Sequence, residues 1–334
     1  MKDSPTSYIR NKPVRLILAL GALTLLLATL SLAVGSVHVP IGEVLSAIFG
    51  GGDSAIVLYA RAPRVCACLL AGGALAVSGA LTQSVLANPL AAPSTIGVNS
   101  GAGMAAALCC ALAPSATALV PVAAFLGGLL AALLVLFIAG KTGASRLTLV
   151  LAGVAISNVL GAGVDAVVTF FPDALAAYSD FRIGSLANLT MQRLAMPAVI
   201  IAVSLAAALS LTNELDVLTL GADTASSLGM NAKRTRVILL AVAAALAGAA
   251  VSFAGLLGFV GLIAPHIVRR FTGDEARFLL PASCLCGASL LLLCDLLSRT
   301  LFRPYELPVG IALAFTGGPF FIYLLLRQRK GRTA

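Results

Sequence analysis

The chain has 334 residues, of which 60% are hydrophobic and only 10% are charged. Soluble domains carry about 25% charged residues, so this composition excludes an ordinary soluble protein and indicates an integral membrane protein. The net charge of +9 would suit a nucleic-acid partner in a soluble protein, but the usual excess of Lys and Arg in cytoplasmic loops accounts for it here. We therefore expect membrane lipid around the chain and no nucleic acid.

Long apolar runs separated by short polar segments make up most of the chain. A helical span needs about 20 apolar residues, whereas the spans of a β-barrel alternate apolar and polar residues. These runs do not alternate, so the sequence predicts an all-α integral membrane fold, with about ten transmembrane helices in one domain, residues 1–334. The spans are expected at residues 14–34, 62–86, 98–118, 121–140, 147–170, 194–212, 237–254, 258–268, 278–298 and 307–326.

Lys and Arg are distributed unevenly between the two ends of these spans. Of the 22 in the chain, sixteen fall on the same side as the N-terminus and six fall on the other side. Short cytoplasmic loops of membrane proteins are rich in Lys and Arg, so the first side is expected to be cytoplasmic. The sequence thus predicts a multi-pass protein with both termini in the cytoplasm.

The second predicted span lies between a basic start and a proline-rich end. Arg61 and Arg64 precede it, and its uncharged interior is rich in Gly and Ala, which allows neighbouring helices to approach closely. It ends at Asn88-Pro89-Leu90, where proline prevents a regular helix. Irregular backbone at membrane depth is tolerated only against protein or a water-filled cavity, so we expect this corner beside a path through the membrane.

Two acidic residues lie inside predicted spans. Asp165 is in the middle of the fifth span, and Asp295 is near the outer end of the ninth. Acidic residues within a membrane are rare and are often functional. Neither has a Lys or His close by in the sequence, so we expect a structural, hydrogen-bonding role and not a proton relay.

Five short motifs follow one another along the chain: Arg61-Ala-Pro-Arg64, Asn88-Pro-Leu-Ala-Ala-Pro93, Ala264-Pro-His266, Glu306-Leu-Pro-Val-Gly310 and Gly317-Gly-Pro319. In this order they resemble the FecCD-like family, the iron-siderophore and cobalamin permeases of bacterial ABC importers. The resemblance implies a type II ABC importer permease in the bacterial cytoplasmic (inner) membrane. It implies inward transport of a ferric siderophore or similar metal chelate, with cobalamin or haem as the alternative cargo.

The resemblance also implies partners. Such a permease works with a second permease subunit, two ATP-binding subunits and a substrate-binding protein. The sequence contains no Gly-x-x-x-x-Gly-Lys-[Ser/Thr] phosphate-binding loop, so we expect ATP hydrolysis in partner subunits and no enzyme activity in this chain. No cofactor and no metal site are expected in the chain.

Three arginines match positions that dock the binding protein in the resembled family: Arg61, Arg64 and Arg299. The planar guanidinium group suits this role because it can bind a carboxylate through two hydrogen bonds. Contact with lipid headgroups is the alternative interpretation, since long basic side chains often reach the membrane surface.

Two further groups of residues match functional positions of the family. The segment Ala225-Ser226-Ser227-Leu228-Gly229 matches the coupling helix, which would lie in a groove of the ATPase subunit; an ordinary connecting loop is the alternative. Asn88, Pro89 and Leu90, with Ser145 in the turn that begins at Gly143, would narrow the inner end of the pathway as a translocation gate. For Asn88, simple termination of the helix is the alternative.

A secondary transporter with broken helices and its own ion coupling is the competing prediction. The Pro and Gly interruptions of the spans fit it. The scarcity of acidic residues in the membrane and the lack of an evident inverted repeat argue against it. Proton-dependent uptake by the chain alone, without an ATPase, would separate the two functions.

Overall fold

A computed structural model describes residues 5–35, 42, 55–141, 145–302 and 305–330. Every regular element in these ranges is a helix, so the predicted all-α fold is confirmed. The helices are α1 (Pro5–Ala33), α3 (Ala62–Leu86), α4 (Val98–Leu112), α5 (Val120–Lys141), α6 (Arg146–Phe170), α7 (Ala174–Ile183), α8 (Met191–Ser210), α9 (Thr212–Thr219), α10 (Ala222–Ser227), α11 (Ala232–Ala254), α12 (Val260–Thr272), α13 (Ala276–Thr300) and α14 (Val309–Lys330).

Seven helices among the described residues are long and apolar enough to cross a membrane: α1, α3 with the π-helical turn Ile56–Arg61 before it, α5, α6, α8, α11 and α13. The other three predicted spans fall on the shorter helix α4, on α12 and on α14. Helix α4 ends at Leu112, before the expected end at residue 118, because Pro114 follows and the residue before a proline disfavours helical backbone. The figure of ten crossings stays a prediction.

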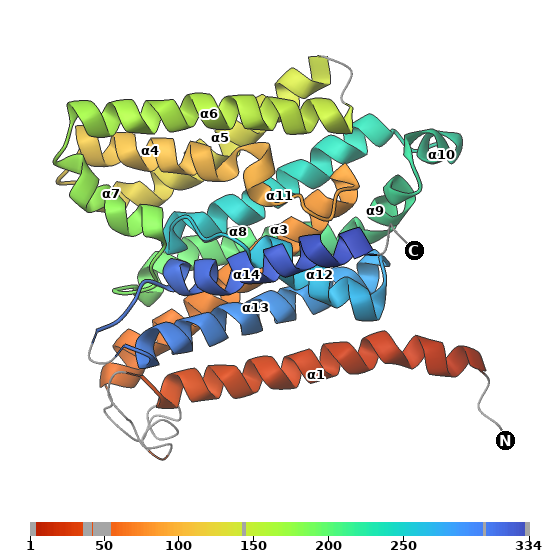
Figure 1. Cartoon of the computed structure of the whole chain (residues 1–334), viewed down its shortest axis with the longest axis horizontal. Coiled ribbons are helices and arrows are strands. Elements are labelled where there is room, and N and C mark those ends of the chain that lie inside the picture. Colours follow the sequence, from red (N-terminus) through yellow and green to blue (C-terminus); the bar gives the residue numbers. More distant parts are fainter. Residues whose placement is uncertain (1–4, 36–41, 43–54, 142–144, 303–304, 331–334) are drawn as a thin grey trace.

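Helix α3 lies at the centre of the bundle, with α13, α11 and α12 packed around it (Figure 1). A Cβ atom on Gly72 would lie 2.4 Å from the carbonyl oxygen of Gly287 in α13. One on Gly79 would lie 1.8 Å from the carbonyl oxygen of Gly261 in α12. No side chain fits at these distances, so the glycines allow direct contact between backbones, as expected from the small residues in this span.

Hydrogen bonds also join α3 to these neighbours. Ser78 Oγ donates to the carbonyl oxygen of Ala243 in α11 at 2.6 Å. Gln83 Nε2 donates to the carbonyl oxygen of Gly261 at 3.2 Å. Both side chains are buried, and a buried polar group without a partner would be costly. These bonds therefore stabilise the positions of α11 and α12 on α3.

Helices α1 and α6 lie on opposite sides of the bundle (Figure 1). Of the residues in an apolar stretch of each helix, only 17% in α1 and 11% in α6 are buried within this chain. Leu18 and Leu25 in α1 are each 68% exposed. Exposed apolar area on this scale indicates contact with lipid or with another subunit. Helix α1 is held to α13 by a hydrogen bond of 2.8 Å between the Thr24 and Ser289 hydroxyl groups.

The ends of the helices form two faces, at the left and right of Figure 1. The α7 face contains α7, the starts of α3 and α14, and the end of α13. The α10 face contains α9, α10 and the start of α11. Helix α1 begins and helix α14 ends on the α10 face. The ends of these two helices that lead to the chain termini are therefore on the same side, as the charge pattern predicts. Which face is cytoplasmic stays a prediction.

Candidate functional site

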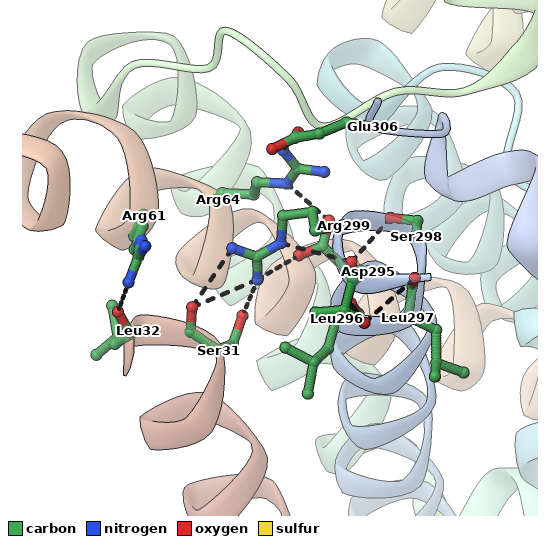
Figure 2. Close-up of polar contacts among 11 residues, drawn as sticks. Ser31, Leu32, Arg61, Arg64, Asp295, Leu296, Leu297, Ser298, Arg299 and Glu306 are labelled. Atoms are coloured by element: carbon green, nitrogen blue, oxygen red, sulfur yellow. Dashed lines mark hydrogen bonds and ion pairs between the residues drawn. The ribbon is translucent and has the colours of Figure 1, made fainter. Parts of the chain in front are cut away.

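A buried group of charged side chains lies at the α7 face, where α3 begins and α13 ends (Figure 2). Arg64 Nε lies 2.7 Å from Asp295 Oδ1, and Arg64 Nη1 lies 2.7 Å from Glu306 Oε2. Asp295 belongs to α13, and Glu306 lies in the connection that leads to α14. One guanidinium group therefore ties together three parts of the chain.

Arg299 lies one turn after Asp295 in α13, with its Nη2 2.9 Å from Asp295 Oδ2. Its guanidinium group also donates to the carbonyl oxygen of Ser31 in α1, at 3.4 Å, and to the Ser31 hydroxyl. The Asp295 side chain has no exposed surface and is shared between Arg64 and Arg299. Two opposite charges offset the cost of burying this carboxylate, and the contacts agree with the structural role expected for Asp295.

Arg61 donates from Nη1 to the carbonyl oxygens of Leu32 and Ala33, at 2.7 and 2.9 Å. All three sequence-predicted docking arginines are buried, with exposed fractions of 5% for Arg61, 9% for Arg64 and 3% for Arg299. The structure brings them together, and their side chains point into the protein (Figure 2). These contacts are with the protein itself, and contact with lipid headgroups stays the alternative interpretation. Docking of a binding protein stays a prediction.

The acidic members of this arginine cluster, Asp295 and Glu306, were not predicted to pair with arginines. The spacing of Asp295 and Arg299, four residues apart on one helix, is a signal that could have found the first pair. No local pattern relates Glu306 to Arg64, because 242 residues separate them. Within the described residues, no group of three or more His, Cys, Asp or Glu side chains could hold a metal ion.

On the α10 face, the predicted coupling segment forms the end of α10 and the turn that follows it. Ala225 is buried, whereas Ser226, Ser227 and Leu228 are exposed, Leu228 by 65%. Gly229 has a φ of +80°, in the left-handed region that favours glycine. The turn therefore directs the chain from α10 into α11 and leaves the Leu228 side chain at the surface.

A hollow of about 530 Å³ lies beside α10. It is lined by Ala222, Ser226, Gly229, Met230, Asn231, Ala232, Lys233 and Arg236. Asn231 caps α11, because its side-chain oxygen accepts a hydrogen bond of 3.0 Å from the Arg234 backbone N–H. Lys233 Nζ donates to the carbonyl oxygen of Gly140 at the end of α5, also at 3.0 Å. The turn after α10 thus leads into a capped α11, and the first turn of α11 is attached to the end of α5.

The predicted gate begins where α3 ends. Ala87 has a φ of +47°, and the Asn88 side-chain oxygen accepts a hydrogen bond of 2.9 Å from the Leu90 backbone N–H. Asn88 therefore stabilises the turn that terminates α3, which was its alternative interpretation. Pro89 is exposed, and Asn88 and Leu90 are half-buried. A role of these three residues as a gate stays a prediction.

Ser145, the remaining predicted gate residue, caps helix α6. Its Oγ accepts a hydrogen bond of 3.0 Å from the Thr148 backbone N–H, and the side chain is exposed. Gly143 lies outside the described residues. Near the end of α3, Arg269 of α12 donates from Nη2 to Ser84 Oγ at 2.9 Å. The observed roles at these positions are capping and attachment of helix ends.

Comparison with known proteins gives a family for this arrangement. The model of the FecCD transport family matches residues 23–327. The chain belongs to the FecCD transport family. This result confirms the resemblance carried by the five sequence motifs. The function in which the α7 face and the α10 face take part is therefore transport.

Three known permease proteins are similar to this FecCD family member over most of their length. The Fe(3+)-citrate import system permease protein YfmE of Bacillus subtilis is 37% identical, over 96% of this chain and 97% of its own length. The ferric enterobactin transport system permease protein FepD of Escherichia coli is 39% identical, over 92% and 94%. The hemin transport system permease protein HmuU of Yersinia pestis is 38% identical, over 83% and 84%.

A solved structure has the same fold as this FecCD family member. It is an inward-facing conformation of a metal-chelate type ABC transporter, with a TM-score of 0.83 and 27% sequence identity. The match covers 94% of this chain and 99% of that chain. The predicted architecture of an ABC importer permease is therefore confirmed.

Proposed function

We propose that this chain is the permease subunit of a binding-protein-dependent ABC importer that carries a ferric siderophore or similar metal chelate inward. The observation that carries the proposal is that the apolar bundle has two different ends, the α7 face and the α10 face. One face holds the arginine cluster and the other holds α10 with its turn. Near full-length relatives named for iron citrate and enterobactin support an iron chelate as the cargo. The relative named for hemin keeps haem as the alternative, with cobalamin.

A second permease subunit, identical or related, completes the pathway in this proposal. Asn158, Asp165 and Thr169 follow one another on one side of α6 at helical spacing, and all three are exposed in this chain. A charged residue costs about 2.5–3.5 kcal/mol at the centre of a helix in lipid. Asp165 lies near the end of α6 and would bear part of that cost. Contact with another subunit or with an aqueous pathway avoids that cost, so this side of α6 faces the partner permease or the pathway between the two.

Two ATP-binding subunits supply the energy, and α10 receives them. Leu228 is exposed on the α10 face, beside the hollow of about 530 Å³. The turn after α10 leads directly into α11, and the first turn of α11 is bonded to the end of α5, so movement of an ATPase subunit against α10 would be transmitted to membrane-spanning helices. With α10 on the cytoplasmic side, both termini are cytoplasmic, and the gate residues Asn88, Pro89, Leu90 and Ser145 lie at the inner end of the pathway.

The substrate-binding protein docks on the opposite side, at the α7 face. Arg61, Arg64 and Arg299 gather three positive charges there, and acidic residues of the binding protein are the matching chemistry. In this proposal the helices position the arginines, and the carboxylates of Asp295 and Glu306 compensate the charges of Arg64 and Arg299 before docking.

The test is uptake by the reconstituted complex, with its binding protein and ATPase subunits, of an iron-loaded siderophore, ferric citrate, haem or cobalamin. We expect ATP-dependent uptake of an iron chelate and none by the chain alone. ATP-independent, proton-driven uptake by the chain alone would favour the secondary transporter. ATP-dependent uptake of haem or cobalamin only would keep the importer and replace the cargo.

The coupling role has its own test. In Gly229→Pro the backbone cannot adopt the observed φ of +80°, because the proline ring fixes φ near −65°. We expect uptake to fall at least tenfold while the binding protein still associates with the complex. Gly273 also has a positive φ, +71°, but it follows α12, so Gly273→Pro serves as a control for backbone strain outside α10. Normal uptake by Gly229→Pro would refute the coupling role.

A further inference from the structure

The two carboxylates of the arginine cluster differ in their access to solvent. The Asp295 side chain has no exposed surface and contacts two arginines. The Glu306 side chain is 35% exposed and contacts Arg64 through a single pair of atoms, Oε2 and Nη1. Asp295 is therefore a fixed counter-ion, and Glu306 can be exchanged for another carboxylate.

A cavity of about 100 Å³ lies beside this exchangeable contact. It is lined by Gly35, Ile56, Ala60, Arg61, Arg64, Arg299 and Glu306. Its charged lining therefore consists of three guanidinium groups and one carboxylate, an environment that attracts a further carboxylate.

We propose that Glu306 occupies the place of a partner's carboxylate, and that an acidic side chain of the substrate-binding protein displaces it from Arg64 Nη1 on docking. This inference rests on the proposed function, because it takes the binding protein as the partner. Glu306 is then an internal competitor that keeps the docking arginine paired while no binding protein is bound.

The exchange leaves no buried charge without a partner at any stage. Arg64 Nε, which lies 2.7 Å from Asp295 Oδ1, keeps this partner while Nη1 changes its acceptor. A guanidinium group has five N–H donors in fixed directions, so separate acceptors can be held and released independently. Removing the only partner of a buried charge is strongly unfavourable, whereas replacing one carboxylate by another conserves charge and hydrogen bonds. Binding would then depend on the difference between two similar contacts, which keeps docking reversible.

The experiment measures the affinity of the substrate-binding protein for the complete complex in lipid nanodiscs at low salt. Glu306→Gln removes the competing charge and keeps the shape of the side chain. We expect it to lower Kd roughly fivefold, the effect of an ion pair worth about 1 kcal/mol. Glu306→Asp keeps the charge on a shorter side chain and should give a smaller decrease. Arg64→Gln should raise Kd, and the double variant should match Arg64→Gln.

Glu275→Gln is the matched control. Glu275 also forms an ion pair with an arginine, Arg277, but it lies at the start of α13, whose other end forms the arginine cluster. Its Kd should equal that of the unmodified complex. If Arg64→Gln raises Kd while neither Glu306 variant lowers it, docking stands and the exchange is refuted. If Arg64→Gln leaves Kd unchanged, docking at this cluster is refuted, and the exchange with it.

Discussion

At the scale of single residues, Asp295 is the residue on which the arginine cluster depends. Its carboxylate is the shared counter-ion of Arg64 and Arg299, and its side chain is completely buried. A buried ion pair adds little net stability compared with an apolar pair, but removal of one member leaves the other charge uncompensated. Loss of the Asp295 carboxylate is therefore expected to lower the stability of the protein.

We predict that Asp295→Asn destabilises the protein by about 3–5 kcal/mol, because the buried Arg299 loses its carboxylate partner and Arg64 keeps only the partly exposed Glu306. The measurement is the midpoint of thermal unfolding of the purified chain in detergent. Asp173→Asn is the control: Asp173 is exposed, and its side chain makes no capping hydrogen bond to α7. Equal midpoints for the two variants would contradict the structural role of Asp295.

At the scale of elements, the positions of α12 and α13 on α3 depend on glycines at the helix contacts. The backbones meet at Gly72 with Gly287 and at Gly79 with Gly261, where a Cβ atom would overlap a carbonyl group. Helices in a membrane gain little from burying apolar side chains, because lipid is equally apolar, so close backbone packing becomes a main source of association.

We predict that Gly79→Ala lowers stability by about 1–3 kcal/mol or more, because its Cβ would lie 1.8 Å from the backbone oxygen of Gly261, which cannot move aside as a side chain could. Gly21→Ala in α1 is the matched control, since a Cβ there meets nothing within 4 Å. Its unfolding midpoint in detergent should be unchanged or slightly higher. A Gly79→Ala protein that unfolds like the unmodified protein would rule out the close α3–α12 contact.

At the scale of the whole molecule, the bundle has two polar faces with different chemistry. The α7 face holds the paired arginines, and the α10 face holds a short helix with an exposed leucine and a hollow beside it. In the proposed function this difference allows transport in one direction, with the substrate delivered at the α7 face and the energy supplied at the α10 face.

We predict that the two faces lie on opposite sides of the membrane, with α9 and α10 in the cytoplasm. Thr219→Cys in α9 and Ala176→Cys in α7 place exposed thiols on the two faces. A membrane-impermeant maleimide should label Ala176→Cys in intact cells and Thr219→Cys only in inside-out vesicles. The unmodified protein, with its seven native cysteines, gives the background. Labelling of Thr219→Cys from outside would reverse the proposed orientation.

The sequence by itself determined the class of the protein, most of its helices and its family. Continuous apolar runs and prolines are local features of the sequence, so the length of a span and the end of α3 at Leu86, just before Asn88 and Pro89, could be recognised from them. Tertiary structure alone decided which residues meet. Arg64 contacts Glu306, 242 residues away, and Gly72 lies against Gly287. Contacts of this kind depend on how the helices pack, and they produce no periodic pattern of residues in the sequence. For this reason the pairing of Arg64 with Glu306 could not be predicted, whereas Asp295 and Arg299, four residues apart on one helix, carry a local signal.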